Sequence, residues 1–132
     1  MNKMPTISEL RKLLKPYEMK NNNLAFLLWF FDYALFILGQ YAVIVLPVFL
    51  KIVGSLITFI VIGRLAILAH DAAHNSFTTS KKLNRFFSQT AFLPSLITFS
   101  GWSQVHHIKH HGFTNLVTKD DIWQPLFINR RI

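Results

Sequence analysis

All six histidines of this 132-residue chain lie in two short clusters, a grouping that is typical of a metal site. The clusters are His70-Asp71-Ala72-Ala73-His74 and His106-His107-Ile108-Lys109-His110-His111. On an α-helix, side chains four residues apart stand on one face about 6 Å apart, near enough for two imidazoles to bind one metal ion. His70 and His74 have that spacing. Because imidazole binds Fe, Zn, Cu and Ni, the ligand type alone does not select the metal.

Two α-helical registers compete in the second cluster. His107, His110 and His111 share one face at i, i+3 and i+4, whereas His106 lies four residues before His110. The sequence leaves open whether His106 or His107 is a ligand, although His107 gives the denser group. The candidate metal ligands are therefore His70, His74, His107, His110 and His111.

Carboxylates are expected to act behind the imidazoles and not as ligands. The glutamates, Glu9 and Glu18, lie far upstream of both clusters, which argues against the carboxylate-rich di-iron site of soluble helix bundles. Metal-bound histidines usually donate their second ring N–H to a carboxylate or carbonyl. Asp71, Asp120 and Asp121 are near enough in sequence for that role. The chain has no cysteine, which excludes disulfides and thiolate metal sites.

Two apolar runs precede the first cluster and predict membrane-spanning helices. Residues 24–46 would form about 34 Å of helix and residues 52–69 about 27 Å, against about 30 Å for the hydrocarbon core of a bilayer. Asp32 in the first run should face a neighbouring helix or the interface, because a carboxylate exposed to lipid is costly. Arg64, near the end of the second run, can snorkel to the headgroups. The expected fold class is an all-α membrane protein.

The flanking segments are expected to lie along one membrane surface. Residues 6–15 have amphipathic periodicity and capping-box spacing between Thr6 and Glu9, as either a helix on the headgroups or a solvated leader. A third apolar run, residues 86–99, would span only about 21 Å and contains Pro94, so it is too short to cross. Both histidine clusters should therefore lie on the same side of the bilayer.

The charge pattern places that side in the cytoplasm. Hydrophobic residues make up 52% of the chain and charged residues 15%, too apolar a balance for a small soluble domain. The net charge is +8, and basic residues flank the two runs: several precede the first run and several follow the second, with only Lys51 between the runs. These flanking residues are Lys3, Arg11, Lys12, Lys15, Lys20, Lys81, Lys82 and Arg85. This is the positive-inside pattern, and without interleaved stacking aromatics it does not predict a nucleic-acid partner.

The two clusters resemble known motifs. Residues 70–76 resemble the first histidine box of membrane fatty acid desaturases, which also follows the second membrane helix. Trp102, residues 107–115 and Asp120 resemble the second box and its Thr-Asn and Asp tail. Arg64 and Asn84 fall where that family often has such residues, and the resemblance covers about residues 52–125. The 32 residues from 75 to 106 separate the boxes as in desaturases and not as in sterol desaturases or fatty acid hydroxylases.

The resemblance implies a membrane-bound enzyme with two non-haem irons held by histidines from three boxes. It implies the use of O2 and two electrons from a ferredoxin- or cytochrome-type donor, and a double bond, or in some members a hydroxyl, placed in a fatty acyl lipid or acyl thioester. The location would be the bacterial inner membrane or the endoplasmic reticulum.

The same resemblance implies an incomplete domain. The expected parts of this single domain, residues 1–132, are a cytosolic leader (1–23), two transmembrane helices (24–69) and a cytosolic or interfacial histidine-box region (70–132). A third box and later helices are not in the sequence, so on its own the chain is expected to bind iron weakly and not to turn over.

Two other classes of function fit the same residues. A membrane metal-binding or transport protein would use these imidazoles without oxygen chemistry and would bind Zn or Cu as readily as Fe. A structural two-helix membrane protein would carry the histidines incidentally.

Overall fold

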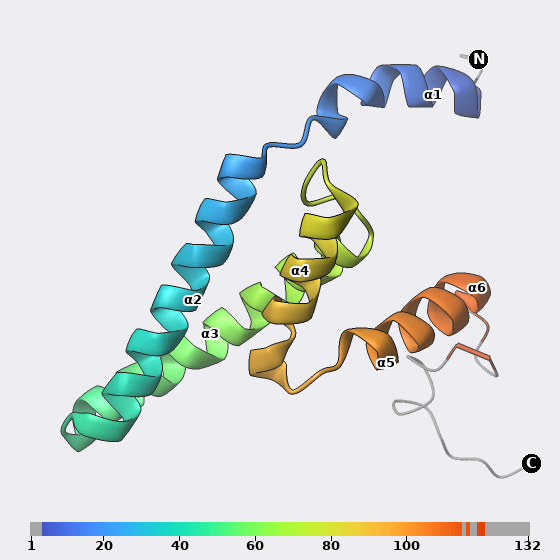
Figure 1. Cartoon of the computed structure of the whole chain (residues 1–132). Helices are drawn as coiled ribbons and strands as arrows, with labels where there is room; N and C mark the ends of the chain where they lie inside the picture. The colour runs from blue at the N-terminus through green and yellow to red at the C-terminus, as the bar shows by residue number, and fades with distance from the viewer. Residues whose placement is uncertain (1–3, 115, 117–118, 121–132) are drawn as a thin grey trace, which may run out of the picture.

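A computed structural model describes residues 4–114, 116, 119 and 120 (Figure 1). Every regular element of these residues is a helix, which confirms the all-α class. Lys3, Asn115 and Asp121, which the sequence analysis singles out, lie outside the described residues. The elements are α1 (Ile7–Leu14), η1 (Lys15–Glu18), α2 (Asn22–Val45), α3 (Val48–Ala73), α4 (Lys81–Ala91), η2 (Leu93–Ser95), α5 (Phe99–Ser103), η3 (Gln104–His110) and α6 (His111–Phe113).

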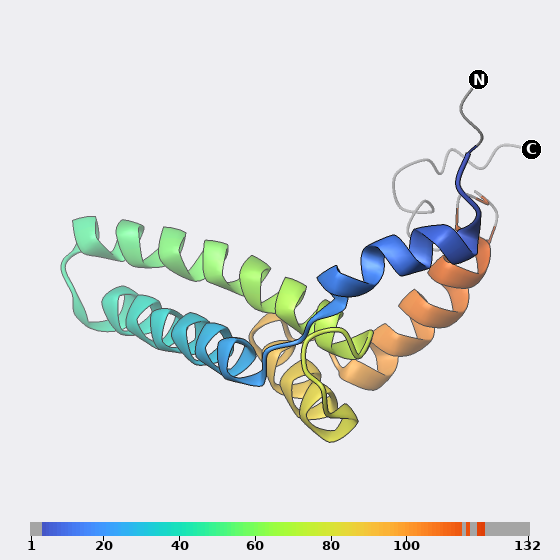
Figure 2. The same ribbon diagram turned by 90° about the horizontal axis from the view of Figure 1, so that it is seen from above.

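Helices α2 and α3 form an antiparallel hairpin (Figure 2). Asn21 caps α2 by accepting from the backbone N–H groups of Asn23 and Leu24. The helix ends at Val45 because Leu46 precedes Pro47 and takes an extended conformation. Helix α3 begins directly after Pro47 and runs past residue 69 to Ala73, so it is longer at both ends than the 52–69 run predicts.

Both hairpin helices are long and apolar enough to cross a membrane. With 24 and 26 residues they measure about 36 Å and 39 Å. In the most apolar stretch of each helix only 11% and 22% of the residues are buried, so large apolar side chains such as Phe30, Ile44 and Phe59 stay open on the outer faces. Such faces suit lipid or further membrane helices.

Two glycines let the hairpin helices approach closely. A Cβ added to Gly54 would lie 2.7 Å from the Cβ of Ala42 and 2.9 Å from the backbone oxygen of Gly39. A Cβ on Gly39 would lie 2.5 Å from Oγ1 of Thr58. Small residues at such crossings are the usual basis of helix association in membranes, because they allow backbone-to-backbone packing. The crossing therefore depends on the absence of side chains at residues 39 and 54.

An ion pair with a buried carboxylate and a half-exposed guanidinium joins the hairpin helices between their ends. The Nε atom of Arg64 on α3 donates to Oδ1 of Asp32 on α2 at 2.8 Å, and the Asp32 side chain is only 1% exposed. Asp32 thus faces the neighbouring helix, as expected. The Arg64 guanidinium turns to this carboxylate while its side chain stays 47% exposed, so Arg64 has a protein partner that the sequence does not predict.

Helix α4 packs across the open end of the hairpin, the end where α2 begins and α3 ends (Figures 1 and 2). Ser88 Oγ donates to the backbone oxygen of Ala69, which ties α4 to α3. Trp29 and Tyr33 on α2 donate to the hydroxyl and the backbone oxygen of Thr90 at 3.1 and 2.5 Å. A buried apolar cluster fills the space between these helices: Val61, Leu65, Ala69, Ala91 and Phe92.

The third apolar run is not one helix. Residues 86–91 belong to α4, and η2 and a non-helical turn follow before α5 begins at Phe99. Pro94 lies in η2, and Leu96 has a left-handed backbone with φ 56°. The run is therefore divided between elements: the break at residues 92–98 turns the chain, and the helix that starts at Phe99 leads into the second histidine cluster.

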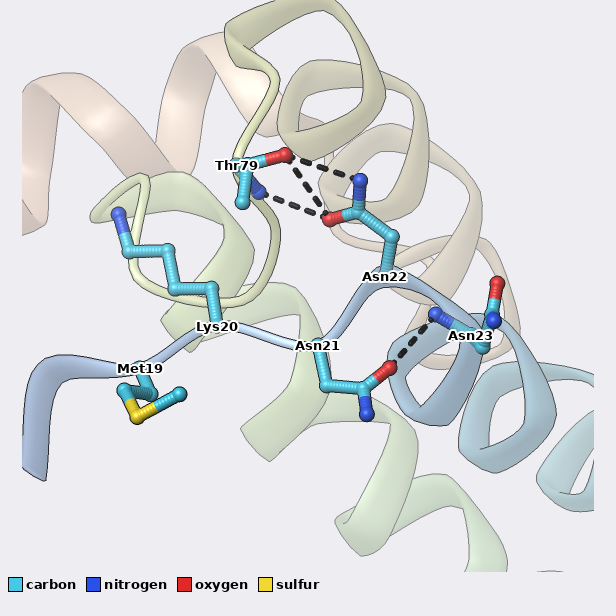
Figure 3. A pocket seen from close by; sticks show the side chains of 6 residues that line it. All are labelled: Met19, Lys20, Asn21, Asn22, Asn23 and Thr79. Carbon is cyan, nitrogen blue, oxygen red and sulfur yellow. Dashed lines mark hydrogen bonds between the residues drawn. The ribbon is translucent and has the colours of Figure 1, made fainter.

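The leader is fastened to the loop that follows the first cluster. Asn22 and Thr79 face each other, and Oδ1 of Asn22 accepts from the Thr79 backbone N–H at 2.9 Å (Figure 3). Lys20 Nζ donates to the backbone oxygen of Asn75 at 2.6 Å. Helix α1 itself is exposed, and its capping box between Thr6 and Glu9 is present as predicted. The basic leader therefore reaches the same end of the hairpin as the histidines.

Replacing Gly54 by Ala is expected to lower the free energy of unfolding by about 1–3 kcal/mol, because the new methyl group would overlap the backbone of α2. Gly63→Ala in the same helix is the matched control, since a Cβ there meets nothing within 4 Å. It should be neutral or stabilising by up to about 1 kcal/mol, as alanine favours helix over glycine. Thermal unfolding followed by circular dichroism in one micelle type compares the two. Equal effects would contradict the close crossing.

Arg64→Met is expected to destabilise the hairpin by about 3 kcal/mol, because it leaves the Asp32 carboxylate buried without its cation. The double variant Asp32→Asn/Arg64→Met removes both charges and should recover most of that loss. The measurement is again thermal unfolding in micelles. A double variant that is no more stable than Arg64→Met would show that the ion pair does not hold the helices together.

Candidate metal centre

The first histidine pair lies on the last turn of α3. Helix α3 continues without a break from its apolar stretch through His70, and the backbone N–H of His74 still donates to the His70 oxygen at 3.1 Å. Asn75, with φ 57°, then ends the helix. The two rings lie 4.5 Å apart between centroids, so the predicted common face is present. A rigid helix thus fixes both imidazoles relative to the hairpin.

The second cluster is carried by a π-helix, η3, and not by the α-helix that the sequence analysis assumes. Its hydrogen bonds join residues five apart, as in the bond from the His111 N–H to the His106 oxygen. This register brings Nε2 of His106 and Nε2 of His111 to 3.1 Å. The α-helical argument that favoured His107 over His106 is therefore wrong in its geometry. Short π-helical segments often occur at functional sites.

The two clusters meet at the open end of the hairpin. The His74 ring lies 4.6 Å from that of His107 and 4.9 Å from that of His111, and the His70 ring lies 5.0 Å from that of His106. His110 lies 5.2 Å from His106, further from α3. All five predicted ligands and His106 therefore form one group of rings. Within it, ring nitrogens of His70, His74 and His106 all lie within 4.8 Å of one another.

Three rings have a hydrogen-bond partner behind them on Nδ1. For His70 the partner is Asp71 at 3.2 Å, and for His110 it is the buried Asp120, with both oxygens at 3.0 Å. For His107 the partner is Ser103 Oγ at 3.3 Å. The two aspartates were expected, whereas Ser103 was missed; its only sequence signal is its position four residues before His107. A hydrogen bond on Nδ1 leaves Nε2 of each ring available as a ligand atom.

Two ring nitrogens at the centre have no hydrogen-bond partner within the described part of the chain. They are Nε2 of His74 and Nε2 of His107, and both are buried. A buried polar atom without a partner is costly unless something else binds it. A metal ion is the occupant that a group of imidazole nitrogens fits. The residues present therefore fit a metal centre.

Burial keeps these rings neutral. The pKa values of His74, His106 and His107 lie below the ordinary value, first because burial disfavours the charged ring and then because neighbouring histidines repel a second charge. For His106 these effects lower the pKa to about 4. Asp71 acts in the opposite direction on His74 but does not reverse the shift. Neutral imidazole is the form that binds a metal.

Trp102 packs beneath the second cluster. Its ring stacks on that of His106 at 4.3 Å between centroids and 17° between planes, and it meets His70 edge to face at 5.5 Å. It also contacts the core residue Phe92 at 5.0 Å. The resemblance places Trp102 in the motif of the second box. In the structure it links the apolar core to the imidazoles of both clusters.

Comparison with known proteins identifies this arrangement. A profile of the fatty acid desaturase family matches residues 47–131, which include both clusters. The chain is 32% identical over 80 residues to the sn-1 acyl-lipid omega-3 desaturase (ferredoxin) of Synechocystis sp., covering 61% of this chain and 21% of the relative. It is 34% identical over 93 residues to the chloroplastic omega-6 fatty acid desaturase of Arabidopsis thaliana, covering 70% and 19%.

A third relative, the sn-1 acyl-lipid omega-3 desaturase (ferredoxin) of Nostoc sp., is 28% identical over 133 aligned positions, covering 94% of this chain and 35% of the relative. The chain thus spans between about a fifth and a third of the length of these relatives. No solved structure matches it significantly. Because the profile covers more than half of the residues and contains the whole group of imidazoles, this chain belongs to the fatty acid desaturase family.

Proposed function

We propose that this chain supplies part of the metal centre of a membrane-bound non-haem di-iron enzyme that introduces a double bond into a fatty acyl chain. The observation that supports this most is the meeting of both histidine clusters at one end of a membrane-length hairpin. An acyl tail lies in the hydrocarbon layer, so its oxidation needs a metal held at the edge of that layer. A helix that leaves the apolar stretch and carries His70 and His74 on its last turn meets that need.

His70, His74, His107, His110 and His111 are the proposed iron ligands, with the remaining ligands coming from the third histidine box of the family. Two irons bound there would supply the oxidising chemistry: O2, two electrons and two protons, together with one hydrogen from each of two adjacent acyl carbons, would give the double bond and two waters. The protein residues hold their ring nitrogens in place for this. Asp71, Ser103 and Asp120 fix the Nδ1 atoms, so that Nε2 of each ring is available as a ligand atom.

The proposed substrate is an acyl lipid or acyl thioester, and the proposed electron donor is of the ferredoxin or cytochrome type. Two of the relatives are acyl-lipid desaturases named as ferredoxin-dependent, which supports the lipid substrate and the ferredoxin-type donor. The exposed basic residues Arg11, Lys12 and Lys15 of the leader provide a charge that would attract an acidic donor or anionic lipid. They lie before α2 and therefore at the histidine end of the hairpin.

We also propose the topology that follows from these charges. The hairpin crosses the membrane twice, with its turn at residues 46–47 outside and the leader and histidines in the cytoplasm. The chain is then one part of a single desaturase domain, divided into a leader (1–23), two transmembrane helices (24–69) and a histidine-box region (70–132). The positive-inside excess around α2 and α3 is the argument for this orientation.

A chimaera tests the function. Residues 47–131 of this chain would replace the matched segment of the Synechocystis sp. desaturase, and the double bonds of membrane fatty acids would be measured by gas chromatography. The chimaera should form product. His107→Ala or His110→Ala within it should reduce product and bound iron at least about 100-fold. Loss of a residue that only hydrogen-bonds to a ligand, such as Asp120, would cost about 10–100-fold.

The matched control is Gln104→Ala, an exposed residue of the same helix, which should leave product unchanged. A chimaera that inserts into the membrane and binds iron but forms no product would contradict the proposed activity. One that binds Zn or Cu as readily as Fe and forms no product would favour a metal-binding or transport protein.

The lowered pKa values predict the acid behaviour of the metal-free protein. Unfolding returns these histidines to a pKa near 6.5, so below that pH the unfolded state binds more protons than the folded state. Their contribution to stability is therefore complete above about pH 6.5 and is lost as the pH falls below that value, for His106 towards pH 4. NMR of 13C-labelled histidine in micelles should show His106 titrating near pH 4. A His106 that titrates near 6.5 would contradict the burial of its ring.

A further inference from the structure

We propose that His106 is a metal ligand, and that with His70 and His74 it forms a three-imidazole site for one divalent transition-metal ion. The resemblance to desaturases assigns the ligand role in the second box to His107, His110 and His111, so it gives His106 no function. The inference shares His70 and His74 with the proposed di-iron centre and rests on metal binding there, but it does not depend on oxygen chemistry.

The distances permit one ion to contact all three rings. Because the three nitrogen atoms lie within 4.8 Å of one another, there is a point no more than about 2.8 Å from every one of them, compared with 2.0–2.1 Å for a zinc–imidazole bond. Each nitrogen would have to move inwards by no more than about 0.8 Å, which a small side-chain rotation achieves. His107 does not belong to this three-nitrogen group, although its ring is near that of His74.

The π-helix and Trp102 together aim the His106 ring at α3. The wider turn of η3 places His106 beside His111 and against the end of α3, where its ring contacts those of His70 and His74 at 5.0 and 5.5 Å. Trp102 covers one face of the His106 ring in a near-parallel stack. The ring is therefore held by packing before any ion arrives, and such preorganisation favours binding.

Three imidazoles from two helices leave coordination positions open. A site with three protein nitrogens and at least one further position is the arrangement that catalytic metal sites use, since water or another small ligand completes the coordination. Nε2 of His111 lies 3.1 Å from Nε2 of His106, so this ring is close enough to contact such a ligand or the same ion. The site is thus suited to an exchangeable ion with an accessible face.

The test is Co2+ binding to this chain in lipid nanodiscs, because Co2+ substitutes for other divalent metals and its visible absorption reports the number and type of ligands. The wild-type chain should bind one Co2+ with an absorption spectrum of nitrogen ligation. His106→Phe keeps a ring that can stack on Trp102 but removes the ligand nitrogen. It should weaken Co2+ binding more than about 100-fold, which is more than the loss of a residue that only hydrogen-bonds to a ligand would cause. Gln104→Ala is the matched control and should bind like the wild type.

Two outcomes overturn the proposal. If His106→Phe binds Co2+ within about threefold of the wild type while His70→Phe loses it, His106 is not a ligand, and the five-histidine centre of the proposed function remains. If the wild-type chain binds no Co2+ with its helices intact by circular dichroism, the three-imidazole site does not exist. The chimaera experiment tests the proposed function separately. If the chimaera forms no product but Co2+ binding still depends on His106, the proposed function fails and the His106 site remains.

Discussion

Every contact between the two imidazole clusters depends on α3 running without a break from Val48 to the turn that carries His70 and His74. A helix transmits position along its axis because each backbone hydrogen bond fixes the next residue. The depth at which the hairpin sits in a membrane therefore also sets the position of the His70 and His74 rings. A kink anywhere between Gly54 and Ala69 would move the rings away from α5 and η3. The close crossing at Gly39 and Gly54 and the Asp32–Arg64 pair both act against such a kink, since each holds α3 against α2.

The second cluster reaches the first through a different kind of constraint. No long helix carries it; the break at residues 92–98 redirects the chain, and Trp102 then anchors the new helix by packing on Phe92 and on the imidazoles. Helix α4, which precedes the break, is held against α3 by the hydrogen bond of Ser88 and against α2 by the hydrogen bond of Thr90. The site therefore combines one rigid element with one that is positioned by aromatic packing. When a metal binds, we expect the histidine side chains of η3 to move more than those of α3, because η3 is held by aromatic contacts and not by a continuous long helix.

The sequence predicts the parts of this arrangement that follow from local periodicity. The two long helices, the capping box at Thr6, the common face of His70 and His74 and the convergence of the clusters all depend on helical spacing or on chain length, and they are present in the structure. The π-helical register of η3, the pairing of Arg64 with Asp32 and the role of Ser103 depend on which atoms meet after packing. An α-helical count cannot foresee a helix whose hydrogen bonds join residues five apart, and a snorkelling arginine cannot be told from a paired one until the facing helix is known.

Charge explains why the carboxylates stand behind the imidazoles. Neutral imidazoles do not compensate the charge of a bound cation, so a centre built from them at the edge of an apolar layer leaves a net positive charge where solvation is poor. Asp71 and Asp120 bring negative charge close to that position through His70 and His110 while leaving the coordination positions to nitrogen. Asp120 is itself buried, which is tolerable because both of its oxygens have Nδ1 of His110 within 3.0 Å. Asp71 and Asp120 thus orient the imidazole rings and also balance the positive charge of a metal ion bound by them.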